Sequence, residues 1–197
     1  MTRIVVASGN AGKLAEFNRL LSDAGLEFVS QRDLGVEDIE ETGLSFVENA
    51  LLKARHASRV TGLPALADDS GLCVDALDGA PGLYSARYAG THGDADANIA
   101  KLLDALDGVQ EAQRGAHFHC TLALLRHPDD PRPLLAEGEW CGRILHAPRG
   151  EAGFGYDPVF LDPETGLTAA ELEPATKNRI SHRGRALAKL QHAISAL

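Results

Sequence analysis

The chain has 197 residues, of which 44% are apolar and 24% are charged, and its formal net charge is −9. This length and composition fit a globular protein with a real core, built as one large domain or as one domain in two lobes. The negative charge argues against a protein that coats nucleic acid, because such a protein needs a basic surface.

Location follows from the N-terminus and the cysteines. No apolar run approaches the roughly 20 residues of a membrane span. A strand is predicted directly after Met1-Thr2-Arg3, so we expect no signal peptide. Cys73, Cys120 and Cys141 contain no CxxC pair, which favours buried, reduced thiols over a disulfide framework or a zinc site. We therefore expect a cytoplasmic protein without a membrane partner.

The first predicted strand, Ile4–Ala7, runs into a glycine-containing loop at residues 8–13 and then into a helical pattern over about residues 11–24. Unpaired N–H groups at a helix N-terminus suit a phosphate, and glycines let the backbone approach it. Lys13 adds a point charge. The alternative is an ordinary strand-to-helix turn. The glycine spacing fits neither a P-loop nor a GxGxxG motif.

An acidic loop, residues 37–43, holds four carboxylates in five residues. Such a run is either a solvated face or a site for a divalent cation. Ser45 and Glu48 then form a capping box, which predicts a helix that ends near Gly62 and Pro64. Lys53 lies off the apolar stripe of this helix.

The segment Ala65–Val74 begins as an apolar strand and meets two adjacent carboxylates, Asp68 and Asp69, followed by a Ser-Gly turn. Carboxylates at a strand end often serve as metal ligands or bases in α/β proteins. The alternative is an Asp-Ser-Gly turn in which the aspartate caps its own backbone. In regular strand geometry only one of the two aspartates faces a given site.

The middle of the chain predicts a helix over 94–106, a polar connection over 108–115, and two strands over 117–125 and 134–144 that form an antiparallel hairpin. The connection is the nearest thing to a boundary. His117 and His119 share a face at a spacing that can bind metal, but no neighbouring residue completes a ligand set, which favours an outward polar face.

The last quarter predicts a loop over 150–158, a strand over 159–161, a short helix from 168–172 and a final helix over 183–197. Glycines flank Phe154, which leaves its ring able to stack on a flat ligand. Ser181 is a candidate N-cap of the final helix. Ser-His-Arg at a helix start gathers hydrogen-bond donors, or is simple capping.

Six short motifs occur in a defined order: Ser8-Gly9-Asn10-Ala11-Gly12-Lys13, Glu40-Glu41-Thr42-Gly43, Ala67-Asp68-Asp69-Ser70-Gly71-Leu72, Gly82-Leu83-Tyr84-Ser85-Ala86-Arg87-Tyr88, Gly153-Phe154-Gly155-Tyr156-Asp157-Pro158, and Lys177 with Ser181-His182-Arg183-Gly184. Together they resemble the bacterial form of the inosine triphosphate pyrophosphatase family, the non-standard purine nucleoside triphosphate pyrophosphatases. The resemblance covers essentially the whole chain. It departs at Ser8, where the family commonly has threonine.

The resemblance implies an α/β fold with an elongated, two-lobed mixed sheet, flanked by helices, and a central cleft, as one domain over residues 1–197. It implies a homodimeric, Mg²⁺-dependent enzyme that cleaves inosine, deoxyinosine and xanthosine triphosphates to the monophosphate and pyrophosphate, and so cleanses the nucleotide pool. The partner is a purine nucleotide and not a nucleic acid polymer.

The resemblance also implies a site. Asp69 would act as general base and Lys53 as a second catalytic cation. Glu40 and Asp69 would hold the metal, with Glu41 and Asp68 as alternatives in register. Donors would select the O6 acceptor of the base, Asp157 would help to exclude guanine, and Phe154 would stack on the ring. The implied substrate-binding residues are Ser8, Gly9, Asn10, Ala11, Gly12, Lys13, Ser70, Phe154, Gly155, Tyr156, Asp157, Lys177, His182 and Arg183.

Two rival functions remain. One is a pyrophosphatase of the related septum-inhibition (Maf-type) group, which shares the strand–loop–lysine start but would lack the Phe-Gly-Tyr-Asp and Ser-His-Arg elements. The other is a nucleotide-sensing protein that binds without turnover, and the intact set of carboxylates argues against it.

Overall fold

The computed structural model describes residues 2–8, 14, 17–18 and 26–195. Gly9, Asn10, Ala11, Gly12 and Lys13 of the predicted phosphate loop, and most of the helix predicted over 11–24, lie outside these residues. The described strands are β1 (Thr2–Val6), β2 (Leu26–Ser30), β3 (Ala65–Val74), β4 (Gly115–Leu125), β5 (Leu134–Ile144) and β6 (Phe160–Leu161). The described α-helices are α2 (Phe46–Thr61), α3 (Ala95–Ala105), α4 (Pro174–Ile180) and α5 (His182–Ser195).

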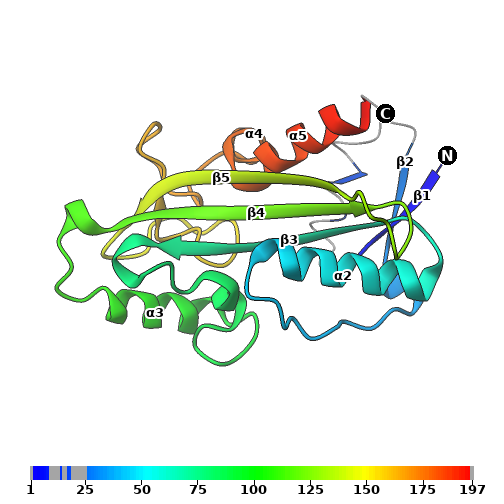
Figure 1. Cartoon of the computed structure of the whole chain (residues 1–197). Coiled ribbons are helices and arrows are strands. Elements are labelled where there is room, and N and C mark those ends of the chain that lie inside the picture. The colour runs from blue at the N-terminus through cyan, green and yellow to red at the C-terminus, as the bar shows by residue number, and fades with distance from the viewer. Residues whose placement is uncertain (1, 9–13, 15–16, 19–25, 196–197) are drawn as a thin grey trace. The chain divides into compact units, whose positions relative to one another are not determined.

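The strands form one mixed sheet of six strands in the order β2-β1-β3-β4-β5-β6 (Figure 1). Strand β1 is parallel to both β2 and β3, and β5 is antiparallel to β6. Strands β4 and β5 are neighbours joined by a turn; β5 has the bounds expected for the hairpin, whereas β4 begins two residues earlier than expected, at Gly115. The predicted fold class, a mixed α/β sheet flanked by helices, is confirmed.

The chain divides into two compact units, and each is assembled from separated segments. Unit 1 comprises residues 1–69, 120–138 and 185–197, and unit 2 comprises residues 70–119 and 139–184. The connection over 108–115, the nearest thing to a boundary in the sequence, lies inside unit 2. The divisions fall inside β3, β4, β5 and α5, because these elements contribute to both units and leave no linker to mark a boundary.

Unit 1 places helices on both faces of its part of the sheet (Figure 1). Alanines of α2 pack with Val5, Ala65 and Ala67 on one face, whereas Ala186, Leu187 and Leu190 of α5 pack with the alternate residues of the same strands on the other. Successive strand residues point to opposite faces, so a continuous apolar run is what a sheet covered on both sides requires.

Unit 2 packs α3 against its parts of β3, β4 and β5 in a separate core that contains Phe118, Trp140 and Phe160. The buried Arg114 donates to the backbone carbonyls of Leu106, Ile144 and Leu145 at 2.8–3.0 Å. Burial lowers the pKa of this guanidinium, and the three carbonyls accept hydrogen bonds from three of its N–H groups.

The helix starts follow the predicted caps. Ser45 Oγ accepts from the backbone N–H of Glu48, and α2 ends at Gly62 with a left-handed φ of 69°. Ser181 Oγ accepts from Gly184 N–H at the start of α5. A second prediction is wrong: residues 168–172 form turns, and the short helix begins only at Pro174, whose fixed φ suits a first helical position.

The Ser-Gly turn expected after Asp69 is also wrong, because β3 continues through Ser70 and Gly71 to Val74. Among the described residues, strand β1 pairs with β3 only at Ala65 and Leu66, but β4 also lies next to β3, and this place in the sheet outweighs the local turn preference of Ser-Gly. Of the three cysteines, Cys120 is buried as expected, whereas Cys141 is exposed. No helix in the described ranges has the length and hydropathy needed to cross a membrane.

Candidate active site

Unit 1 brings a lysine between two carboxylates. Lys53 Nζ donates to Glu41 Oε1 at 2.8 Å and to Asp69 Oδ1 at 2.6 Å. Lys53 comes from the middle of α2, Asp69 from the centre of β3, and Glu41 from the loop before α2. The three side chains are only 10–24% exposed. Lys53 therefore lies off the apolar stripe of α2 because its ammonium group contacts two carboxylates.

The loop that carries Glu41 is held by the start of α2. The buried Asn49 accepts from Gly43 N–H through Oδ1 at 2.8 Å, and Glu48 accepts from Leu44 N–H at 3.0 Å. A Cβ on Gly43 would lie 2.6 Å from Asn49 Oδ1, so this close approach requires glycine. The cap of α2 thus also fixes the acidic loop.

The charges in this cluster change one another's pKa. Burial alone lowers the pKa of Lys53, but the charges of Asp69 and Glu41 outweigh it, so the pKa is raised. Burial raises the pKa of Asp69, Lys53 opposes the rise, and the negative charges of Glu41 and Asp68 add to it. A carboxylate with a raised pKa is a better proton acceptor than a free one, which suits a general base.

Asp68 lies on the opposite face of β3, as the strand alternation predicts. Its Oδ2 lies 3.7 Å from Cys120 Sγ, on the side where α5 packs, whereas Asp69 contacts Lys53 on the side of α2. Only Asp69 therefore faces the lysine. Of the two glutamates, Glu41 reaches Lys53, and Glu40 is exposed. The geometry favours Glu41 over Glu40 as a partner of Asp69.

Unit 2 holds a second lysine–carboxylate pair. The buried Asp157 accepts from Lys177 Nζ and from the backbone N–H of Phe154, the latter at 2.7 Å, through one oxygen atom. A Cβ on Gly153, whose φ is +83°, would collide with that carboxylate. The Asp157 side chain thus fixes the turn that presents Phe154.

Phe154 is exposed although it is a large aromatic residue, with 59% of its surface open to solvent. Lys177 Nζ lies 5.0 Å and Arg183 Cζ 6.0 Å from its ring centroid, both within cation–π range. The Phe154 ring is thus exposed, as expected from the glycines on either side of it. Two cations and one carboxylate leave this group with net positive charge.

Helices α4 and α5 place Lys177 near His182 and Arg183, because they meet at Ser181 with almost no separation. A Cβ on Gly184 would collide with the carbonyl oxygen of Asn178, so the approach of the two helices requires glycine here. His182 and Arg183 are both buried.

The structure also describes Tyr156, Gly155, Ser8 and Ser70, which belong to the predicted substrate-binding residues. Tyr156 is buried and donates from Oη to the carbonyl of Ser85 at 2.8 Å. Burial raises its pKa, so it remains a donor at neutral pH. Gly155 adopts a φ of +58°. Ser8 lies two residues after the end of β1, and Ser70 is half-buried after Asp69 in β3.

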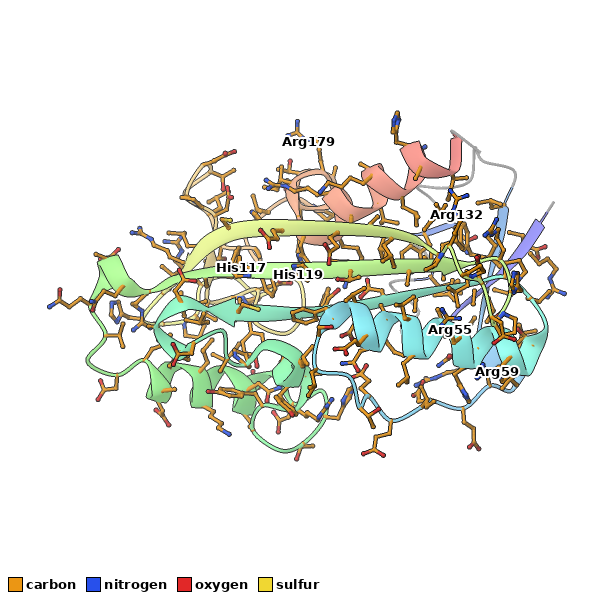
Figure 2. The ribbon with its side chains drawn as sticks, in the orientation of Figure 1. Arg55, Arg59, His117, His119, Arg132 and Arg179 are labelled. Carbon is orange, nitrogen blue, oxygen red and sulfur yellow. The ribbon has the colours of Figure 1, made fainter. Side chains whose placement is uncertain are left out.

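The histidine pair on β4 belongs to no larger group of candidate metal ligands among the described residues. His117 and His119 lie on β4 (Figure 2), and His119 Nδ1 lies 3.5 Å from Glu139 Oε1. Within residues 2–8, 14, 17–18 and 26–195, no group of three or more histidine, cysteine, aspartate or glutamate side chains is placed to hold a metal ion. Glu41 and Asp69 therefore offer two carboxylates as candidate ligands. Two carboxylates are enough to bind Mg²⁺, because this ion usually keeps several of its water ligands.

Three residues of these clusters were missed from the sequence: Asn49, Ser85 and Phe118. Asn49 carried a signal, because an asparagine beside a capping box in a buried helix needs a polar partner. Ser85 accepts from Leu72 N–H, and Phe118 packs on His182. Neither contact has a local sequence signal, since each joins residues distant in the chain.

The mixed sheet and the two clusters define an α/β protein with a buried acidic–lysine centre in unit 1 and a cationic, aromatic loop in unit 2. The chain belongs to the Ham1 family, whose sequence model matches residues 4–193. This membership confirms the resemblance predicted from the motifs.

Three relatives agree over the full length. A protein of Xanthomonas oryzae pv. oryzae named dITP/XTP pyrophosphatase is 65% identical over 197 residues, which cover 100% of this chain and 99% of that protein. A protein of Yersinia pseudotuberculosis with the same name is 58% identical over 98% of each chain. The solved structure of a HAM1 protein from Coxiella burnetii has a TM-score of 0.95 and 51% identity and covers 100% of both chains.

Proposed function

We propose that this chain is a nucleoside triphosphate pyrophosphatase that hydrolyses deaminated purine nucleotides, dITP, ITP and XTP, to the monophosphate and pyrophosphate. The names of its full-length relatives support the reaction and the substrate class. The observation that carries the assignment to residues is the group formed by Glu41, Lys53 and Asp69.

The charge of that group supports a need for a divalent cation. Two carboxylates and one ammonium leave a net negative charge, which would repel a triphosphate. Carboxylate oxygens are the ligands that Mg²⁺ prefers. We propose that Asp69 and Glu41 hold Mg²⁺, and Glu40 remains the alternative for the second ligand. When bound, the ion would neutralise phosphate charge and polarise the phosphate attacked.

In this proposal Asp69 accepts a proton from the water that attacks the α-phosphorus, because its pKa is raised by burial. Lys53 holds Asp69 and Glu41 in place through its two hydrogen bonds and supplies positive charge beside the phosphates. Residues 8–13 would bind phosphate through backbone N–H groups, Ser8 and Lys13. Ser70 would bind next to Asp69.

We propose that unit 2 reads the base. Phe154 is exposed and backed by two cations, which suits stacking on an electron-rich purine ring. Lys177, His182 and Arg183 supply donors for the O6 acceptor that hypoxanthine and xanthine carry and adenine lacks. Asp157 holds Lys177 and the Phe154 turn, and so would fix the position of the lysine donor relative to the stacked base.

The deciding experiment is pyrophosphate release from ITP, dITP and XTP, with ATP, GTP and a pyrimidine triphosphate for comparison, with and without Mg²⁺. We expect rapid, Mg²⁺-dependent release from the first three only. Preference for a pyrimidine nucleotide would indicate the Maf-type alternative. Tight binding of ITP without release would indicate a sensor and would overturn the enzyme assignment.

We further propose a homodimer in the cytoplasm. Light scattering coupled to gel filtration would measure the mass, and one chain is 20.9 kDa. A monomer at micromolar concentration would contradict the dimer.

A further inference from the structure

Phe118 of β4 lies flat against the imidazole of His182. The two ring centroids are 4.9 Å apart and the ring planes differ by 16°. Both side chains are buried, with exposures of 8% and 7%. The sequence contains no signal that Phe118 is functional, because Phe118 follows the same alternation as the other inward-facing residues of its strand.

The phenyl ring of Phe118 is itself fixed by aromatic neighbours. Phe160 lies 4.5 Å from it in a tilted arrangement, and Trp140 lies 6.2 Å away. Trp140 is held by a hydrogen bond of 2.9 Å from Nε1 to the buried Asp162. A Cβ on Gly142 would lie 2.6 Å from the Phe160 ring, so the packing around Phe160 leaves no space for another atom. Close packing of this kind prevents Phe118 from rotating.

A flat neighbour constrains an imidazole in a specific way. The ring nitrogens of histidine donate and accept in the plane of the ring. When one face is covered by a phenyl ring, only the edges remain for polar contacts, and their directions follow from the orientation of the covering ring. His182 is the first residue of α5, where the backbone is fixed by the Ser181 cap. The backbone sets where the side chain starts, and Phe118 sets its plane.

We propose that Phe118 is a positioning residue for base recognition, whose ring fixes the plane in which His182 presents its nitrogens to the purine. This inference rests on the proposed function, in which His182 contacts the base. Preorganised donors bind better because their ordering cost is met before the ligand arrives. The loss of the ring should therefore weaken substrate binding and leave the hydrolytic step intact.

The first test compares Phe118→Leu with Leu102→Ala. Both shorten a buried side chain of the same core, but Phe118→Leu removes the stack on His182, whereas Leu102 lies on α3 and is not one of the aromatic rings that fix Phe118. Both should lower Tm by roughly 2 to 8 °C. Only Phe118→Leu should raise KM for ITP, by about two- to tenfold, with kcat changed by less than a factor of about two. Phe118→Met, which also lacks the ring, should give the same rise in KM.

A double-mutant cycle asks whether Phe118 acts through His182. His182→Ala should weaken ITP binding, and Phe118→Leu should then add no further rise in KM, because the ring has nothing left to orient. Additive effects on KM would overturn the proposal. An equal rise in KM in Leu102→Ala would also overturn it, since that result would indicate general loosening of the core.

A measurement without substrate separates this inference from the proposed function. In the NMR spectrum of the free protein, the ring protons of His182, assigned from a His182→Gln variant, should be shifted upfield by the phenyl ring and return toward random-coil values in Phe118→Leu. Unshifted protons in the wild type would overturn the positioning role alone. A wild-type protein that neither binds nor cleaves ITP overturns the proposed function, and the recognition role with it, even if the stack is observed.

Discussion

The two lysine–carboxylate groups of this protein are built from the same residue types but have opposite charge. In unit 1, Lys53 is shared by Glu41 and Asp69, so negative charge is in excess. In unit 2, Asp157 is held by Lys177, and Arg183 lies near the same aromatic ring, so positive charge is in excess.

The difference shows what each group can bind. We propose that the excess of carboxylate around Lys53 attracts a metal ion. Burial raises the pKa of Asp69, Lys53 opposes this rise, the charges of Glu41 and Asp68 add to it, and a raised pKa favours proton transfer. An excess of cationic donors around an exposed ring suits a flat, acceptor-rich ligand. In the proposed function, the same pair of residue types serves chemistry in one unit and recognition in the other.

The largest effect is expected from Asp69→Asn. The amide cannot accept the proton of the attacking water, so kcat should fall by about 100- to 10,000-fold. Pyrophosphate release measures this, and circular dichroism with an ITP binding isotherm checks that fold and binding persist. Turnover within tenfold of the wild type would remove Asp69 from the role of general base.

The next largest effect tests unit 2. Phe154→Ala should raise KM for ITP by about 5- to 150-fold, because stacking of a base on an aromatic ring contributes about 1–3 kcal/mol. Stability should change little, since the ring is largely exposed. Leu167→Ala, which shortens another exposed apolar side chain of unit 2, is the control. An unchanged KM for Phe154→Ala would contradict the stacking role.

A smaller effect separates the two glutamates. Glu41→Gln should raise the Mg²⁺ concentration for half-maximal activity by about tenfold or more, since one hard anionic ligand is lost. Glu40→Gln should change it by less than about twofold, because Glu40 is exposed. Activity titrated with Mg²⁺ and Mn²⁺ binding followed by electron paramagnetic resonance give independent readings. A larger effect of Glu40→Gln would restore Glu40 as the ligand.

The smallest effect concerns a carboxylate of unit 1 that serves structure. Asp130, buried in the turn after β4, accepts from Arg126 through the side chain and the backbone N–H, and from Arg132 N–H. The hydrogen bond from the Arg126 side chain is the main cause that holds the pKa of Asp130 below its usual value. A depressed pKa in the folded state stabilises the protein above the unfolded-state value of about 3.9, and this contribution is lost as the pH falls toward the folded-state value.

Asp130→Asn should therefore lower the free energy of unfolding by about 1–2 kcal/mol at pH 7, and by progressively less below about pH 4. Urea denaturation at several pH values measures it. Asp129→Asn is the control, because the Asp129 side chain is 85% exposed. A deficit that stayed constant into acid would contradict the ionic origin.

Local signals predicted much of this molecule. The capping box at Ser45 and Glu48, the left-handed glycine after α2 and the strand alternation at Asp68 and Asp69 each depend on neighbouring residues, and each is found in the structure. The resemblance of the ordered motifs supplied the family, which no single motif did.

The failures depend on distant residues. Ser70-Gly71 has the composition of a turn, yet β3 continues through both residues beside β4, a strand from a distant part of the chain. The proposed preference for Glu41 over Glu40 rests on where Lys53 points, and that depends on how α2 packs. The unit boundaries fall within β3, β4, β5 and α5 and leave no change in composition to detect.

The core of unit 1 has a consequence for synthesis on the ribosome. Ile4 and Val6, near the start of the chain, share one apolar cluster with Ala186, Leu187 and Leu190, near its other end. Contacts of such high sequence separation form late, and a nascent chain must leave Ile4 and Val6 without these partners until α5 has emerged. A chain shortened before Ala186 should therefore be recognised by chaperones and proteases rather than accumulate as a partly active nucleotide binder.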